Sequence, residues 1–307
     1  MKFKSLIFCA VCACSAFAST AYAQDLPQNL PIDGQMVKLD AKKLWRMTYL
    51  PNAQLHNAEK ISQNVTYPSI APDGSKVIMF ERGKPGEFNA LHEWTPQAQK
   101  EIMRAENVSA YVSWDDDSTF SMRERSKPFE RDTEHHKFTL EKSKPILKKI
   151  HKNDADTFVV YDADDVIILE SKKTKTLQAI SDLRADRYYG PVLSPDQKYV
   201  AFNGLTSGIH LFDIEANAVV FIASQGTSPT FSPDGKYLIY AVTTDNGHEF
   251  ESGDLVLIDL EKRAYRYISN PSNEIRIRAT LSKNAEFIAY QTEDNKIFRA
   301  EFPIETK

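Results

Sequence analysis

Histidines and carboxylates are the residues of this chain that could hold a metal ion, because zinc and calcium take these ligands in proteins. A Glu-His-His sequence at 134–136 follows Asp132, but adjacent histidines of an extended strand point to opposite sides and do not converge on one ion. His92 and His210 occupy matching positions in the similar segments Leu-His-Glu-Trp and Ile-His-Leu-Phe. A repeated structural unit explains this match more simply than a shared ion does.

The chain also contains two acidic runs, at 115–117 and 162–165, and one sequence similar to a nucleophile elbow. The acidic runs lack the glycine and the distal glutamate of an EF-hand loop, so they are typical of turn aspartates that bond to their own backbone. The Gly-Leu-Thr-Ser-Gly sequence at 204–208 has threonine where a serine hydrolase carries its nucleophile, and no glycine-rich phosphate loop is present. The sequence therefore predicts no catalytic residue, no metal and no cofactor.

A repeated turn defines the elements that must position these residues. Ser-Pro-Asp-Gly occurs at 232–235, Ala-Pro-Asp-Gly at 71–74 and Ser-Pro-Asp-Gln at 194–197, and weaker copies begin at Ser113 and Ser282. Proline presets φ, aspartate bonds to the backbone, and glycine supplies the positive φ that a tight turn needs. Each copy lies between two apolar runs. The copies recur about every 40 residues, or near a multiple of that, which is the period of a four-stranded propeller blade.

Strands placed on this period predict an all-β fold, a six-bladed β-propeller of four-stranded antiparallel blades. The second strand of each good copy is almost continuously apolar, as expected for a sheet covered on both faces. The sixth unit is one strand short, and an open edge invites aggregation. We therefore expect an N-terminal strand, at 36–39 or at 44–49, to close the ring. The expected organisation is a signal peptide at 1–23, an N-terminal segment with the closing strand at 24–60, and the propeller at 61–307.

The Pro-Asp-Gly copies at 72–74 and 233–235, with the variant at 195–197, resemble the WD40-like (PD40) repeats of TolB-type β-propellers. The resemblance covers roughly 60–307. It implies a propeller fold and a partner in the cell envelope, because TolB propellers dock an envelope lipoprotein. TolB also carries an N-terminal α/β domain, and too few residues precede the first copy here to form one. The resemblance therefore concerns the propeller and not the whole of TolB.

Connectivity sorts the loops of such a propeller onto two faces. The turns of the repeat lie on one face, and the second-to-third and inter-blade loops lie on the other. The long insertions at 81–90, 124–136 and 243–254 fall on this second face, and long loops on a rigid scaffold commonly carry binding sites. Arginine and tyrosine are enriched in binding hot spots. The predicted partner-binding residues are Arg82, Arg123, Arg125, Arg131, His135, Arg187, Tyr188, Tyr189, His248 and Arg276.

The N-terminus is typical of an export signal. Lys2 and Lys4 precede an apolar stretch at 6–17, and Ala-Tyr-Ala at 21–23 matches a cleavage site. We therefore expect cleavage after Ala23 and a periplasmic or secreted protein, with a lipid anchor on a cysteine of the signal as the alternative. All three cysteines lie within this signal, so the mature chain is expected to fold without disulfides.

Charge and hydropathy limit the classes of partner. The formal net charge is −4, and loss of the two lysines in residues 1–23, which contain no acidic residue, makes it −6. Mild acidity argues against nucleic acid as a partner, and no later segment has the ~20 consecutive apolar residues of a membrane span. We expect a monomeric, non-enzymatic scaffold that binds a protein or cell-envelope component through its long-loop face. A metal-assisted carbohydrate lyase or lactonase acting at the channel mouth is the alternative.

Overall fold

The part of the chain that the structure describes is built almost entirely of strands. In the computed structural model these residues are 39–105, 108, 110, 112–123, 135–141, 144–148, 158–182, 185–246 and 249–302. The helical elements among them are two short 3-10 turns, η1 (Ala41–Lys43) and η2 (Lys283–Ala285). No described segment forms a helix with the length and apolar character needed to cross a membrane.

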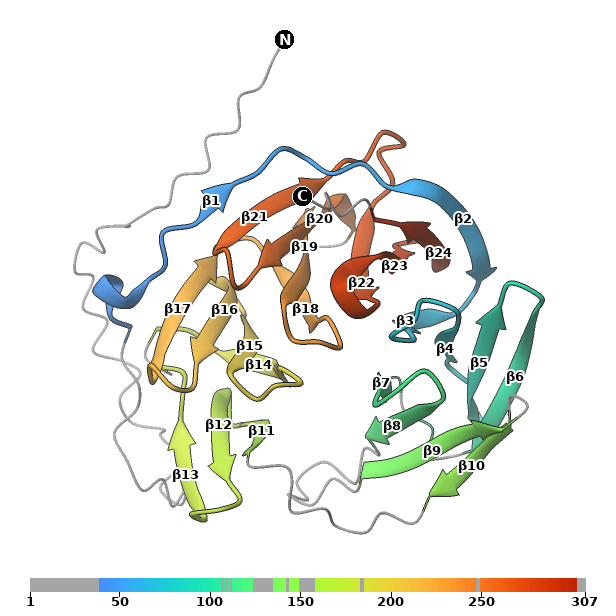
Figure 1. Ribbon diagram of the computed structural model, residues 1–307, viewed down its shortest axis with the longest axis horizontal. Helices are drawn as coiled ribbons and strands as arrows, with labels where there is room; N and C mark the ends of the chain where they lie inside the picture. The colour runs from blue at the N-terminus through green and yellow to red at the C-terminus, as the bar shows by residue number, and fades with distance from the viewer. Residues whose placement is uncertain are drawn as a thin grey trace.

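The described strands form six sheets, in which strands that follow one another along the chain pair antiparallel. Sheet 1 contains β3 (Thr66–Ile70), β4 (Val77–Glu81), β5 (Asn89–Thr95) and β6 (Ala98–Ala105). Sheet 2 contains β7 (Val112–Trp114), β8 (Thr119–Arg123), β9 (His135–Glu141) and β10 (Lys144–Lys148). Sheet 3 contains β11 (Phe158–Ala163), β12 (Val166–Ser171) and β13 (Thr176–Ala179). Sheet 4 contains β14 (Tyr188–Leu193), β15 (Tyr199–Gly204), β16 (Gly208–Asp213) and β17 (Ala218–Ala223). Sheet 5 contains β18 (Thr227–Phe231), β19 (Tyr237–Asp245), β20 (Phe250–Asp259) and β21 (Ala264–Ile268). Sheet 6 contains β22 (Arg276–Leu281), β23 (Phe287–Thr292) and β24 (Lys296–Glu301). Figure 1 shows the sheets side by side around a common centre, which is the arrangement of a β-propeller.

The hydrophobic core lies between neighbouring sheets, because a strand covered on both faces buries consecutive side chains against different neighbours. In β15, Val200 belongs to a cluster shared with sheet 3, whereas Ala201 belongs to one shared with sheet 5. In β4, Ile78 packs with sheet 2, whereas Val77 packs with Ala289 of sheet 6. The near-continuous apolar runs of these strands therefore have the burial that the sequence predicted for them.

The repeated turn joins adjacent strands of its sheet, as its sequence predicted. Ser194 Oγ accepts a hydrogen bond from Tyr199 N at 2.9 Å and donates one to Asp196 Oδ1 at 2.7 Å. Ser232 and Ser282 accept the equivalent bond from the backbone N–H five residues later, at 3.0 and 2.8 Å. The serine of the motif therefore closes the turn by satisfying a backbone donor that the strand ladder leaves free.

The fourth position of the turn requires a positive φ. The φ angle is 74° at Gly74 and 71° at Gly235, and Gln197 and Ala285 adopt 57° and 56° in their copies. Gly74 is also constrained by its neighbour, since a Cβ there would lie 2.2 Å from Cδ2 of Phe287 in sheet 6. The turn tolerates a side chain in two copies at a backbone cost of ~1–2 kcal/mol, but the contact with sheet 6 excludes one at position 74.

Turns of neighbouring sheets also bond to one another. The Asp73 N–H donates to Asp117 Oδ1 of sheet 2 at 2.9 Å, and the Lys283 N–H of sheet 6 donates to Pro72 O of sheet 1 at 2.8 Å. Asp234 Oδ2 of sheet 5 accepts a backbone N–H from the turn of sheet 6 at 3.3 Å. The aspartates therefore connect sheets as well as shaping their own turns.

The N-terminal segment follows the outer edges of sheets 5 and 6 (Figure 1). β1 (Thr48–Tyr49) pairs in parallel with β21, and β2 (His56–Gln63) pairs antiparallel with β24 as the fourth strand of sheet 6. The strand that fills this position is β2 and not 44–49, where the Trp45 N–H donates to Val220 O of sheet 4 and Thr48–Tyr49 pairs with β21 of sheet 5. Of the alternative at 36–39, residues 36–38 lie outside the described residues. The first five residues of β2 are exposed, so this outer strand lacks the apolar pattern by which strands are recognised.

Candidate functional site

The second-to-third loops and the inter-sheet loops share one face, which we call the long-loop face. Arg82 is exposed at the start of the β4–β5 loop, and Arg187 is exposed in the connection between sheets 3 and 4. Arg187 Nε donates to Asp165 Oδ2 at 2.7 Å, and the Tyr188 N–H donates to Asp165 O at 2.8 Å, so the β11–β12 turn belongs to this face too. Tyr189, at the start of β14, is 44% exposed. Three of the predicted residues therefore meet solvent here.

Two predicted residues of this face are buried. Tyr188 is 4% exposed and packs edge-on against Phe202 and His210, and burial is the main cause that raises the pKa of its hydroxyl to about 12. Arg276 is 3% exposed, and its Nη1 donates to Ser269 O at 3.1 Å. Both side chains lie beneath the loops and contribute to their support.

The remaining five predicted residues are described partly or not at all. Arg123 and His135 form a backbone pair at the adjoining ends of β8 and β9, where the polypeptide enters and leaves the insertion between them. The other three lie outside the described residues; they are Arg125, Arg131 and His248.

Exposed apolar side chains on the long-loop face were not predicted. Phe88 in the β4–β5 loop is 56% exposed, Leu205 in the β15–β16 turn is 59% exposed, and Phe250 at the start of β20 is 38% exposed. With Tyr189 they come from sheets 1, 4 and 5. The sequence feature that could have indicated them is a large apolar residue within a polar loop. The prediction was based mainly on arginine, histidine and tyrosine residues and did not consider this feature.

A buried polar network holds one of these loops in place. Asp186 Oδ2 accepts hydrogen bonds from Ser207 Oγ at 2.6 Å, Ser207 N at 2.8 Å and Thr206 N at 2.9 Å, and His210 Nε2 lies 2.7 Å from Ser207 Oγ. Burial opposes ionisation of Asp186, but the hydrogen bonds from Ser207, Thr206 and Arg187 N prevail and lower its pKa. Burial of His210 lowers the pKa of its imidazole to about 4, although the charge of Asp186 opposes this shift.

The direction of the hydrogen bonds decides what this network can do. An ionised carboxylate only accepts, so the single proton of Ser207 goes to Asp186, and His210 donates Nε2–H to the serine oxygen. A catalytic histidine must instead accept the proton of the serine. The network therefore connects the inter-sheet loop to the β15–β16 turn.

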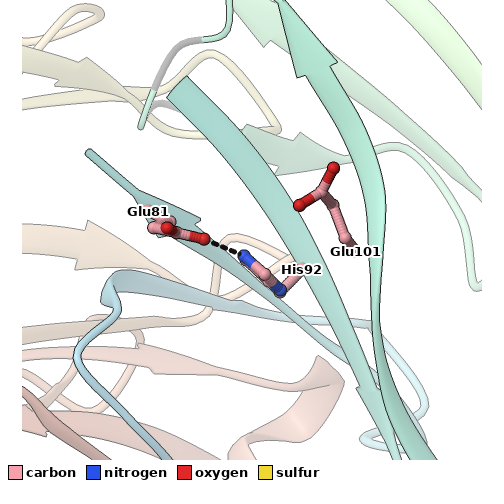
Figure 2. Close-up of side chains that lie close together, drawn as sticks. All are labelled: Glu81, His92 and Glu101. Carbon is pink, nitrogen blue, oxygen red and sulfur yellow. Dashed lines mark hydrogen bonds and ion pairs between the residues drawn. The ribbon is translucent and has the colours of Figure 1, made fainter. Parts of the chain in front are cut away.

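A second cluster joins Glu81, His92 and Glu101, from β4, β5 and β6 (Figure 2). The ligand atoms of these residues lie within 4.8 Å of one another, and His92 Nε2 lies 2.5 Å from Glu81 Oε2. Arg104 Nη2 lies 3.2 Å from Glu81 Oε2 and 2.6 Å from Glu101 Oε2, and its hydrogen bond is the main cause that lowers the pKa of Glu101. Arg104 Nη1 also donates to Phe88 O at 3.0 Å. The guanidinium already supplies the cation that these carboxylates attract, and the cluster fixes the loop that carries Phe88.

His92 and His210 both lie on the third strand of a sheet, β5 and β16. Each bonds to a residue where the preceding strand ends or turns, Glu81 for His92 and Ser207 for His210. Their matching positions therefore correspond to a repeated structural role, the attachment of a loop on the long-loop face.

Comparison with known proteins finds similar solved structures but no family. No protein-family model matches the chain, and no curated protein matches it in sequence. Among solved structures, the C-terminal WD40 domain of Sif2 superposes with a TM-score of 0.39 at 12% sequence identity. The superposition covers 78% of this chain and 70% of that domain. A similarity at this level carries no argument about function.

Proposed function

We propose that this chain is an exported, non-enzymatic β-propeller that binds a protein of the cell envelope through its long-loop face. The observation that carries the proposal is the distribution of exposed large apolar side chains. Four of the six found among the described residues lie on this face, and the other two, Leu39 and Tyr49, lie in the N-terminal segment. Large aromatic and aliphatic side chains are the residues that the core of a protein interface buries.

These side chains lie on sheets 1, 4 and 5, so a partner that contacts all of them would span several sheets. A specific interface covers ~800 Å² per partner, and a fully buried aromatic side chain contributes ~150–250 Å². Phe88, Tyr189 and Phe250 are 38–56% exposed, so each would contribute roughly half of that area. The exposed Arg82 and Arg187 would add polar contacts in the loops that carry Phe88 and Tyr189.

The proposal includes a closed ring of six blades, which would hold these four residues at fixed separations. Its support is the contact between the first and last sheets: Val77 packs with Ala289, and the Lys283 N–H bonds to Pro72 O. The pairing of β2 with β24 adds a strand to the last sheet from the N-terminal side. The repeated turn is the reason to place this ring among TolB-type propellers with WD40-like (PD40) repeats.

Export to the periplasm, with cleavage after Ala23, is also part of the proposal and depends on the pattern of residues 1–23. We propose that the mature protein is a monomer, because contact between copies through the long-loop face would cover the surface that the partner binds. An envelope partner follows from the resemblance to TolB-type propellers.

The test is a quantitative capture experiment with the mature chain, residues 24–307, on envelope extract. One variant, the apolar-loop variant, carries Phe88→Ser, Leu205→Ser and Phe250→Ser. A matched control carries the same number of exposed substitutions on the opposite face, in the turns between first and second or third and fourth strands: Lys198→Ser, Lys236→Ser and Lys262→Ser.

The expected result is one partner that the wild type and the control recover equally. The apolar-loop variant should recover this partner at least ~10-fold less, as loss of a few hot-spot side chains predicts. Circular dichroism and unfolding curves must show that both variants keep the fold. Equal recovery by all three proteins would refute the long-loop face as the binding surface.

A further inference from the structure

The loop between β4 and β5, residues 82–88, folds back closely on itself before it presents Phe88. A Cβ at Gly83 would lie 2.6 Å from Phe88 O, so the two arms of the loop approach each other as only a glycine permits. The Gly83 N–H donates to Asn89 Oδ1 at 3.1 Å, and Asn89 Nδ2 donates to Val108 O, in the connection to sheet 2, at 3.2 Å. The loop is therefore a compact turn that is attached to the next sheet.

A β-bulge in β6 directs Arg104 toward this loop. His92 of β5 pairs with Glu101, whereas the residue before His92 pairs with Met103, so Ile102 is an extra residue in β6. Residues three apart in a regular strand point to opposite faces of the sheet. The extra residue brings Glu101 and Arg104 to the same face, which is one use of a bulge.

Arg104 joins three strands and the backbone of the loop. It lies opposite Ala90 of β5, which in turn lies opposite Glu81 of β4, and directly opposed residues share a face. The small side chain of Ala90 leaves room for Nη2 of Arg104 to reach Glu81 Oε2 at 3.2 Å, and the same nitrogen lies 2.6 Å from Glu101 Oε2. Nη1 donates to Phe88 O at 3.0 Å. The carboxylates therefore orient the guanidinium, and the guanidinium holds the loop.

The bond to the loop is made to the backbone of Phe88 itself. The ring of Phe88 is 56% exposed, so its direction depends on the backbone from which it projects. A partner that meets an ordered side chain does not have to order it, and binding is stronger by the entropy that is saved. The position of the Phe88 carbonyl is therefore linked to the strength of binding.

We propose that Arg104 is a positioning residue for partner binding, which holds the backbone of Phe88 so that the ring meets the partner in a fixed orientation. The binding part of this inference rests on the proposed function, because it places Phe88 in the interface. The ordering of the loop by Arg104 does not depend on a partner, so the two parts can be tested separately.

Hydrogen exchange of the mature protein, followed by mass spectrometry, tests the ordering of the loop. Arg104→Met removes the guanidinium, and Arg104→Lys keeps the charge without the planar fork that bonds to the carboxylates and the loop together. The matched control is Arg299→Met, because Arg299 Nε donates to a backbone carbonyl on the opposite face, Gly74 O, at 2.9 Å.

Amides in residues 82–90 should exchange ~3–10-fold faster in both Arg104 variants, as loss of a hydrogen bond to a charged group predicts, and at the wild-type rate in Arg299→Met. Unchanged exchange of these amides would overturn the proposal. Faster exchange throughout sheet 1 would overturn it equally, because Arg104 would then support the sheet and not the loop.

A double-mutant cycle tests the binding role, with the protein that the wild type captures from envelope extract as the probe. Arg104→Met should lower its recovery ~3–10-fold in the wild-type background and have no effect in a Phe88→Ser background, because Arg104 acts through Phe88. Equal losses in both backgrounds would show that Arg104 acts independently of Phe88 and would overturn the binding role. Capture of no protein by the wild type would refute the proposed function, whereas the exchange experiment would still decide whether Arg104 orders the loop.

Discussion

Protonation of His210 should destabilise the protein as the pH falls. The imidazole is 6% exposed, and burial lowers its pKa from 6.5 to about 4. Because the folded pKa lies below the unfolded value, the unfolded chain binds more protons than the folded chain between these two pH values. The free energy of unfolding therefore decreases as the pH falls through this window and does not depend on His210 well above it.

The size of the effect follows from the shift. At ~1.4 kcal/mol per pKa unit, a shift of this size corresponds to about 3 kcal/mol by the lower end of the window. The carboxylate of Asp186 stays ionised through most of this range, because hydrogen bonds lower its pKa. The imidazole itself, and not the neighbouring carboxylate, is therefore expected to take up the proton that causes the loss.

The assay is urea unfolding of the wild type and of His210→Gln at a series of pH values between neutral and pH 4. Subtracting the two curves removes the titration of groups that both proteins share. The difference in free energy of unfolding should be constant near neutral pH and change by about 3 kcal/mol in favour of the variant as the pH falls. A difference that stays constant over the whole range would refute the assignment of His210 as a buried neutral imidazole.

Three further predictions concern stability and can be checked by urea unfolding at neutral pH. Gly74→Ala should lower the free energy of unfolding by ~2–4 kcal/mol, because a Cβ there would lie 2.2 Å from Phe287. The control is Gly86→Ala, which should cost only ~1 kcal/mol, because Gly86 also has a positive φ, 88°, but no atom lies within 4 Å of its Cβ. Equal costs of the two substitutions would contradict the contact with Phe287. Glu93→Met should raise the free energy of unfolding by ~1–3 kcal/mol, because Glu93 is 1% exposed and its carboxylate oxygens have no hydrogen-bond partner among the described residues; a decrease would show that Glu93 is satisfied. Trp45→Ala should cost ~1–3 kcal/mol, because the indole packs edge-on against Tyr199 and beneath the guanidinium of Arg263; no loss would mean that the N-terminal segment does not stabilise the sheets.

The turns could be predicted from the sequence because their chemistry is local. Within a few residues, Ser194 and Asp196 satisfy the backbone donors of the turn, so the motif requires no knowledge of distant contacts. β2 could not be found in this way. Its first residues face solvent, and its place is decided by the free backbone groups at the edge of β24, which lies more than two hundred residues later in the chain.

Connectivity predicted which loops share a face, and it could not indicate which side chains of those loops are exposed. Of the predicted residues, Arg82, Arg187 and Tyr189 are exposed, and their role in binding stays a prediction. The sequence did not indicate the burial of Arg276, because an arginine after a polar loop is typical of a solvated position, whereas its side chain lies over the ring of Tyr290 in a different strand. The exposure of Phe88 was missed for the opposite reason. Its neighbours in the sequence do not show whether another element of the fold covers its ring.

Site-specific photo-crosslinking tests the central claim, that the long-loop face binds a protein partner, most directly. A photoreactive phenylalanine derivative is introduced at Leu205 in one protein and at Lys262, in the β20–β21 turn of the opposite face, in another. Both are expressed with the export signal in the native envelope and irradiated. The account predicts a discrete crosslinked protein from position 205 and none from position 262. A crosslink from position 262 alone, or the same product from both positions, would contradict it.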